Sequence, residues 1–226
     1  MQPYQEAKNL IVEAARQLTH KGYLSATGGN LSIRIPGQDA LAITPSNYDY
    51  LKMVPDDICI LDLSLKPLEG KRKPSVESGF HAAIYRARPD VGAVIHTHQV
   101  YPSTLAIINK PLPALYDEQA RFLGRCVSII PYAPSGTGML MKKVTRQVKD
   151  HNNAYLMANH GALVLGTDLE RAIHNVDVLE KCALSYLLAL CAGQKAGKIP
   201  LVVREVAFAK LRKDQKMVEK ALKSGG

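Results

Sequence analysis

Segments with the hydrophobic pattern of strands and segments with that of helices alternate along the whole chain, and this alternation limits the possible folds most. No Pro/Gly-rich or polar stretch between these segments is long enough to separate two domains. The chain has 226 residues, 46% of them hydrophobic and 22% charged, which is ordinary for a globular protein and allows a substantial core. The pattern therefore predicts one α/β domain over residues 1–226.

The predicted elements follow from apolar periodicity and from turn residues. The predicted strands are 31–35, 41–44, 58–63, 91–95, 127–130 and 155–165, the last interrupted by Asn159-His160-Gly161. The predicted helices are 7–18, 74–86, 103–108, 139–149, 167–191 and a basic C-terminal helix at about 204–223. Residues 65–73 and 131–138 are predicted loops. Ser75 is the expected N-cap of the second helix, and Thr167-Asp168-Leu169-Glu170 matches a capping box.

A histidine pair, His96-Thr97-His98, follows the predicted strand 91–95 directly. Side chains on a strand alternate between its faces, so His96 and His98 are expected on the same side. Two imidazoles on one face are a common way to hold a transition metal such as zinc. The alternative interpretation is a polar strand end with two solvated histidines.

Two further residues favour the metal interpretation. A helix antiparallel to the strand that follows it would bring Glu77, in its first turn, towards the histidine pair. His160 stands beside Gly161 within a buried strand, where an imidazole without a partner is costly, so a ligand role gains weight. His81, on the same helix face as Glu77, is interpreted as a structural histidine.

Charge and composition limit the classes of molecule that this protein is expected to bind. The net charge is +9, of which the segment 201–226 contributes +4 through seven Lys/Arg and three Asp/Glu. The remaining excess is dispersed and no nucleic-acid-binding motif is visible, so an anionic small substrate or a solvated cationic surface explains it better than nucleic acid. No apolar run predicts a membrane helix, and the N-terminal residues do not resemble a signal peptide. Cys59, Cys126, Cys182 and Cys191 are expected to be buried free thiols, as in a cytoplasmic protein.

Taken in order, five motifs together resemble the class II aldolase/adducin head family, over roughly residues 5–195. They are Gly29-Asn30-Leu31-Ser32, Ile43-Thr44-Pro45-Ser46, Pro74-Ser75-x-Glu77-x-x-x-His81, His96-Thr97-His98 and Asn159-His160-Gly161. The resemblance implies an α/β/α sandwich around a central, mostly antiparallel sheet. It also implies a homotetramer with active sites at the subunit interfaces.

The resemblance also implies roles for individual residues. His96, His98 and His160 would be zinc ligands, with Mn²⁺ or Co²⁺ as alternative ions, and Glu77 would be a fourth ligand and the catalytic acid/base. Tyr116 or Asp117 would contact the substrate. The substrate phosphate would be held by Gly29, Asn30, Ser46, Asn47 and Ser75.

The expected reaction is reversible cleavage of a sugar 1-phosphate, like L-fuculose 1-phosphate, into dihydroxyacetone phosphate and an aldehyde through an enediolate. Glu rather than Asp at position 77 favours an aldolase over a pentulose-phosphate epimerase. Three departures from the aldolase pattern concern the substrate: Val76 replaces a hydroxyl residue, Asn47 replaces glycine, and no aromatic residue follows Phe208. A sugar-acid phosphate decarboxylase is therefore kept as an alternative. A non-catalytic adducin-like module is a remote alternative, because such a module would be expected to lack the metal ligands, whereas His96, His98, His160 and Glu77 are all present in this chain.

Overall fold

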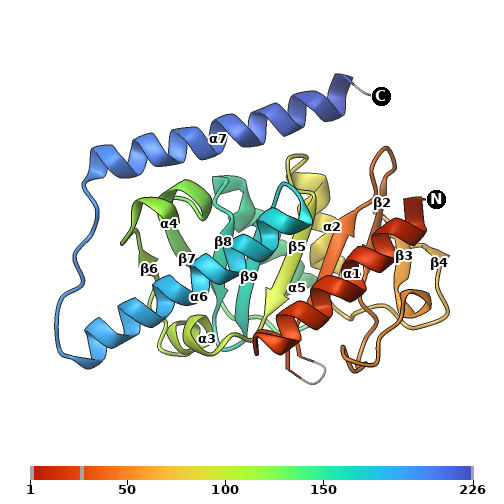
Figure 1. Cartoon of the computed structure of the whole chain (residues 1–226), viewed down its shortest axis with the longest axis horizontal. Helices are drawn as coiled ribbons and strands as arrows, with labels where there is room; N and C mark the ends of the chain where they lie inside the picture. The colour runs from red at the N-terminus through yellow and green to blue at the C-terminus, as the bar shows by residue number, and fades with distance from the viewer. Residues whose placement is uncertain (1–2, 26–27, 225–226) are drawn as a thin grey trace.

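The computed structural model describes residues 3–25 and 28–224. These residues fold around a central sheet (Figure 1). Within these residues the sheet has nine strands in the order β4-β3-β2-β1-β5-β9-β8-β7-β6. All neighbours are antiparallel except β7 and β8. The strands are β1 (Asn30–Arg34), β2 (Ala40–Ile43), β3 (Cys59–Asp62), β4 (Pro67–Glu69), β5 (Ala93–Thr97), β6 (Leu112–Pro113), β7 (Cys126–Ile130), β8 (Ala154–Met157) and β9 (Gly161–Gly166).

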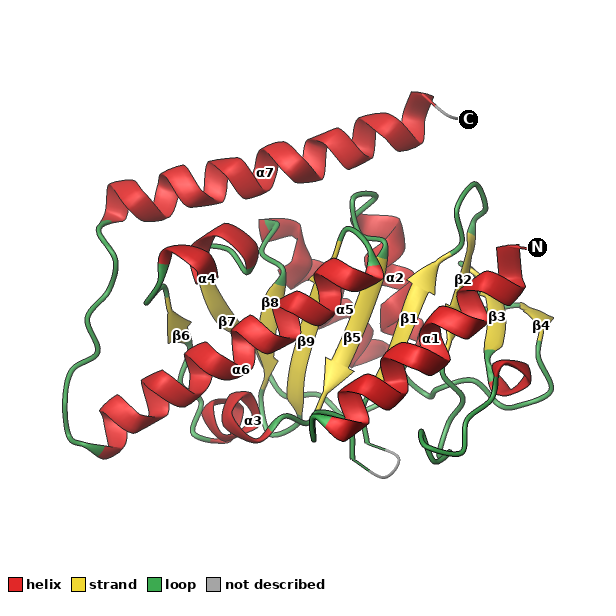
Figure 2. Cartoon of the chain, in the orientation of Figure 1, coloured by secondary structure: helices red, strands yellow, loops and turns green. Residues whose placement is uncertain are grey.

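Helices cover both faces of this sheet (Figures 1 and 2). One face carries α1 (Pro3–His20), α3 (Val100–Ile107) and α6 (Leu169–Cys191), and the other carries α2 (Ser78–Ala87) and α5 (Gly138–Gln147). The strands divide their side chains between two cores. Ala93 and Ile95 of β5 face the core under α1 and α6, whereas Val94 faces the core under α2 and α5. The predicted α/β/α sandwich with a mostly antiparallel sheet is confirmed.

Two helices lie at the end of the sheet where β5 and β8 begin (Figure 2). They are α4 (Asp117–Phe122) and the long α7 (Leu201–Ser224), which packs on α4 through Ala207. Gln215 of α7 is fully buried and donates hydrogen bonds to the His151 carbonyl (3.1 Å) and to Asn153 Oδ1 (3.0 Å). Two short 3-10 helices complete the elements, η1 (Pro55–Asp57) and η2 (Val148–Asp150). No described helix is long and apolar enough to cross a bilayer.

Several local predictions were wrong. Residues 155–165 form a hairpin of two antiparallel strands, because Asn159 takes a left-handed conformation (φ 51°) and reverses the chain. The predicted loop 65–73 contains the edge strand β4, and residues 117–122 of a region expected to be irregular form α4. Asp168, not Thr167, caps α6 by accepting a hydrogen bond from the Arg171 amide. Cys126 is half-buried and Cys191 exposed, although all four cysteines are free.

Candidate active site

Three histidines meet at the end of the sheet where β5 stops. His96 is the fourth residue of β5, His98 follows that strand, and His160 lies in the turn between β8 and β9. The side-chain nitrogens that these histidines offer lie within 4.8 Å of one another. The β5–β9 pairing places Thr97 opposite Ala162, so the hairpin brings His160 beside the pair. The structure therefore brings together the three residues whose ligand role was predicted.

The tautomer of His96 follows from its hydrogen bond. Its Nδ1 lies 2.8 Å from the Ala162 carbonyl oxygen, which can only accept, so Nδ1 carries the proton. The Nε2 lone pair is then free and faces the cluster, as in many metal-bound histidines. Burial, together with the neighbouring histidines, lowers the pKa of His96 to about 4, which keeps the ring neutral near pH 7.

The Glu77 carboxylate completes the cluster. Its Oε2 lies 3.4 Å from His96 Nε2 and its Oε1 lies 3.4 Å from His160 Nε2. The antiparallel packing of α2 and β5 was expected to bring Glu77 here. The cap position differs from the predicted one: α2 begins at Ser78 with Glu77 as its N-cap residue, and the Ser75 hydroxyl accepts a hydrogen bond from the Glu77 amide two residues later.

These separations fit a tetrahedral metal ion. Ligand bonds of about 2.0–2.1 Å to zinc place neighbouring ligand atoms about 3.3–3.4 Å apart. His98 Nε2 and His96 Nε2 lie 3.2 Å apart, close to the 3.4 Å that separates Glu77 from each of its two histidines. The donor set of three imidazoles and one carboxylate also suits zinc.

A small cavity of about 150 Å³ opens beside the cluster. It contains all five residues predicted to hold a phosphate. No lysine or arginine among the described residues lines it, so an anion there would be held by neutral donors and by any metal ion bound to the cluster. Its lining residues are Gly28, Gly29, Asn30, Pro45, Ser46, Asn47, Ser75, Val76, Glu77, His96, His98, Ser135 and His160.

Backbone shape at two of these positions explains the residue types. Gly29 has φ 83°, and a Cβ there would lie 2.6 Å from the His96 carbonyl oxygen, so only glycine fits. Asn47 also takes a left-handed conformation, with φ 53°. Asparagine tolerates that conformation better than other residues with a side chain, so Asn47 can replace glycine there.

Ser135 is a site residue that the sequence did not reveal. It lies in the loop 131–137 and donates a 2.6 Å hydrogen bond to Glu77 Oε1, while Asn30 Nδ2 donates a 2.7 Å bond to Oε2. Burial alone would raise the pKa of Glu77, but His96 and these two hydrogen bonds outweigh burial and lower it to about 2. The only signal in the sequence was a Pro/Gly loop, which could not show where Ser135 points.

A buried chain of hydrogen bonds continues from Asn30 away from Glu77. Asn30 Oδ1 accepts from His81 Nε2 (2.5 Å), so the other ring nitrogen of His81 accepts from the Ser32 hydroxyl (2.7 Å). The Ser32 oxygen then accepts from the Tyr85 hydroxyl (2.8 Å). Burial lowers the pKa of His81 to about 3, which leaves one ring proton and fixes this order. Every donor in the chain points towards Glu77, and His81 has the structural role that was predicted.

Tyr116 and Asp117 are not part of this cavity. They lie at the start of α4, both are exposed, and neither lines the space beside the histidines. Within its own chain, the predicted substrate-contact pair is thus not brought to the site.

Comparison with known proteins places this arrangement in a family. Residues 9–187 match the family model described as class II aldolase and adducin N-terminal domain. The chain is 34% identical over 190 residues to 5-deoxy-D-ribulose 1-phosphate aldolase of Bacillus thuringiensis serovar kurstaki, covering 84% of this chain and 88% of that protein. It is 36% identical over 180 residues to L-fuculose phosphate aldolase of Escherichia coli O6:H1, covering 78% and 82%.

Structural comparison agrees. The structure superposes on a solved L-fuculose 1-phosphate aldolase with a TM-score of 0.86 and 31% sequence identity, covering 92% of this chain and 96% of that one. The chain belongs to the class II aldolase/adducin family, as the motifs predicted. Its relatives named above are sugar-phosphate aldolases.

Proposed function

We propose that this chain is a zinc-dependent aldolase that cleaves a ketose 1-phosphate into dihydroxyacetone phosphate and an aldehyde. The observation that carries the proposal is the cluster of three histidine nitrogens with the Glu77 carboxylate 3.4 Å from two of them. The family membership supports a lyase, and the relatives act on phosphorylated ketoses, as their names state.

The chemistry follows from what each group can do. When bound, zinc supplies the positive charge that polarises the ketose carbonyl. Gly29, Ser46, Asn47 and Ser75 offer backbone amides and hydroxyls that can hold the phosphate. Glu77 lies beside both and transfers the proton at the carbon next to the carbonyl. In the cleavage direction the carbon–carbon bond breaks and the aldehyde leaves; Glu77 then takes a proton from water and passes it to the enediolate carbon.

Ser135 and Asn30 position Glu77. Ser135 donates a hydrogen bond to Oε1 of the carboxylate and Asn30 donates one to Oε2, so the plane of the carboxylate is fixed. One lone pair on each oxygen remains to bind the metal ion or to accept the proton. A carboxylate held in this way needs little reorganisation when it moves a proton.

The proton that leaves the substrate hydroxyl needs a second group, and we propose that a neighbouring subunit supplies it in a homotetramer. The exposure of Tyr116 and Asp117, away from the cavity of their own chain, supports this part of the proposal. The free cysteines support a cytoplasmic location. Neither nucleic acid nor membrane is part of the proposal.

A decarboxylase acting on a sugar-acid phosphate is the second candidate. The specific observation is that α7 carries no tyrosine, and no aromatic residue follows Phe208 that could serve as an acid. Decarboxylation also passes through an enolate next to a polarised carbonyl, but it does not need a proton donor for an aldehyde oxygen.

Product analysis tests the proposal. The zinc-loaded protein is incubated with L-fuculose 1-phosphate, with 5-deoxyribulose 1-phosphate and with a 3-oxo sugar-acid phosphate. Dihydroxyacetone phosphate is measured by its enzymatic reduction, and carbon dioxide by trapping. The aldolase proposal expects dihydroxyacetone phosphate from at least one ketose, lost in Glu77→Gln, whereas carbon dioxide release alone would favour the decarboxylase.

A further inference from the structure

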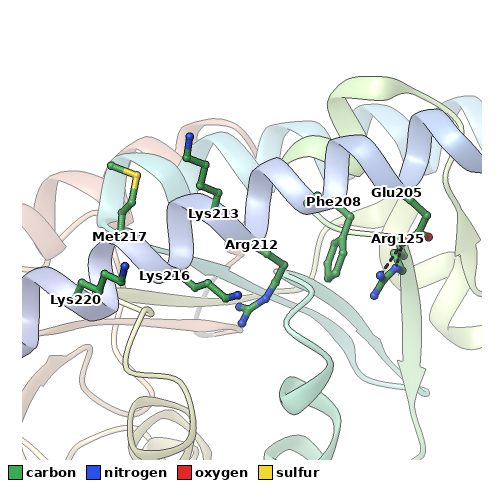
Figure 3. Close-up of a pocket in the computed structure, with 9 residues that line it drawn as sticks. Arg125, Glu205, Phe208, Arg212, Lys213, Lys216, Met217 and Lys220 are labelled. Atoms are coloured by element: carbon green, nitrogen blue, oxygen red, sulfur yellow. Dashed lines mark hydrogen bonds and ion pairs between the residues drawn. The ribbon is translucent and has the colours of Figure 1, made fainter.

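A basic groove runs along α7, the helix that lies at the end of the sheet opposite the histidine cluster (Figure 2). Its volume is about 610 Å³. Five cationic side chains line it: Arg125, Arg212, Lys213, Lys216 and Lys220. Figure 3 shows Arg212 and Lys216 directed under the helix, on the same side as Phe208. None of these residues belongs to the catalytic cavity.

The groove carries an excess of cationic over anionic side chains in its lining. Glu205 is its one carboxylate among the lining residues, and it already pairs with Arg125 (2.6 Å) and Arg204 (2.9 Å). Within the described residues, Arg212 and Lys216 have no carboxylate within ion-pair distance. A concave surface with five cationic side chains and one carboxylate attracts anions and concentrates them.

Arg212 is held in place by neutral partners. The guanidinium is half-buried and donates hydrogen bonds to His151 Nδ1 (2.7 Å) and to Gln215 Oε1. Both acceptors are uncharged, so these hydrogen bonds do not neutralise the positive charge of Arg212. Burial and the charges of Arg88 and Arg212 lower the pKa of His151, so its Nδ1 stays available as an acceptor. The Arg212 fork is therefore oriented before any ligand arrives, and Arg forks match phosphate oxygens well.

The same end of the molecule does not suit a cation. Asp90, His151 and Glu219 offer ligand atoms within 4.8 Å of one another. However, both oxygens of the Asp90 carboxylate already bind Arg88 (2.6 and 2.7 Å), and Arg212 binds His151. Two guanidinium groups beside these three residues repel a metal ion.

We propose that the groove along α7 binds a small polyanion with two or three linked phosphates, such as pyrophosphate or the triphosphate of a nucleotide, with Arg212 as its anchor. Linked phosphates match the spread of Arg212, Lys216 and Lys220 along one side of the helix, and a volume of about 610 Å³ has room for them. Because this groove is separate from the catalytic cavity, the proposal does not depend on the proposed function.

Calorimetric titration tests this inference. The full-length chain is titrated with sodium tripolyphosphate at low and at physiological salt, and so are Arg212→Gln and Lys216→Gln. The control is Lys210→Gln, since Lys210 is exposed on the same helix but does not line the groove. We expect binding to weaken about tenfold in Arg212→Gln, the loss of one charge-assisted hydrogen-bonded contact, and less than about twofold in Lys210→Gln.

Three results would overturn the proposal. The first is that tripolyphosphate does not bind at low salt, and the second is that Lys210→Gln and Arg212→Gln weaken binding equally. The third is that Arg212→Gln binds tripolyphosphate as tightly as the unchanged protein does and that a ketose phosphate displaces it. That result would locate the anion in the catalytic cavity. An oligonucleotide that binds more tightly than tripolyphosphate would replace the proposal with a nucleic-acid surface. A thermal shift of each variant without ligand checks that folding is unchanged.

Discussion

At the scale of single residues, Glu77 is the group on which turnover is expected to depend. Its carboxylate faces two histidines and is held by Ser135 and Asn30. Replacing Glu77 with Gln keeps the size but removes the proton-transfer group, so we expect a loss of kcat of about 10²–10⁴. Zinc content, measured by atomic absorption, should stay near one per chain because three imidazoles remain. Full activity in this variant would contradict the assigned role.

Two substitutions of His81 test the positioning of Glu77, because they separate the hydrogen bond that His81 donates to Asn30 from the packing of its side chain. A Gln amide can donate to Asn30 Oδ1 as the His81 Nε2 proton does, whereas the shorter Asn side chain cannot reach. We expect His81→Asn to lower kcat about 10- to 100-fold, the cost of one buried hydrogen bond to the group that orients Glu77, and His81→Gln to recover most of it. KM and zinc content should change little in either variant. Equal losses in both would assign His81 a packing role only.

How far the sequence could predict the site differs between residues. His96 and His98 were placed together by strand alternation alone, and Glu77 by the direction of its helix. Ser135 could not be predicted, because the path of a Pro/Gly loop depends on contacts with β7 and α5 that no local pattern encodes. The cap residues Glu77 and Asp168 were each missed by one or two positions, since neighbouring polar residues compete for the same amides.

At the scale of elements, the β8–β9 hairpin decides whether His160 reaches the cluster. Gly161 follows it directly, and a Cβ at Gly161 would lie 2.4 Å from the Thr97 carbonyl oxygen and 2.9 Å from the His98 ring. The strands β5 and β9 would have to separate. The sequence suggested an interrupted strand instead, because apolar residues continue on both sides of the turn and only the conformation of Asn159 shows the reversal.

We therefore expect Gly161→Ala to destabilise the protein by about 1–3 kcal/mol and to weaken zinc binding. Urea unfolding and zinc titration would measure both effects. Gly197→Ala is the matched control, because Gly197 has open space around it and should tolerate a methyl group. Unchanged zinc affinity in Gly161→Ala would show that the cluster does not depend on the close β5–β9 contact.

At the scale of the whole molecule, buried neutral histidines make stability depend on pH. Burial lowers the pKa of His81 to about 3 and that of His96 to about 4, both below the ordinary value of 6.5. The unfolded chain therefore takes up these protons first as the pH falls. Stability from both groups is fully present above about pH 6.5 and is lost as the pH falls, down to about pH 4 for His96 and about pH 3 for His81.

For metal-free protein we expect the free energy of unfolding to fall by about 2.7 kcal/mol per pH unit near pH 5 from these two histidines. Urea unfolding over a pH series would measure the slope. His81→Gln should halve it, and the exposed His20→Gln should not change it. A flat profile between pH 6.5 and 4 would contradict the buried, neutral state of both rings.

Assembly is also a question at this scale. If neighbouring subunits complete each site, co-expression of Glu77→Gln with Asp117→Asn should restore about a quarter of the activity, because mixed tetramers form some intact sites. Activity no higher than that of either variant alone would place all catalytic groups in one chain.

The sheet order belongs to this scale as well, and residue patterns could predict it only in outline. Alternating strands and helices indicated an α/β domain, and the family resemblance supplied the antiparallel sandwich. The neighbours β1–β5 and β5–β9 join segments about 60–70 residues apart. Such pairings depend on long-range packing, which periodicity within a segment does not encode.

The most direct measurement of the central claim uses dihydroxyacetone phosphate alone, without a choice of aldehyde. The zinc-loaded protein is incubated with it in heavy water, and loss of one hydroxymethyl proton signal is followed by NMR, with and without chelator. We predict stereospecific exchange that stops on chelation and in Glu77→Gln. No exchange by protein that holds one zinc ion per chain would contradict proton transfer by Glu77 at this site.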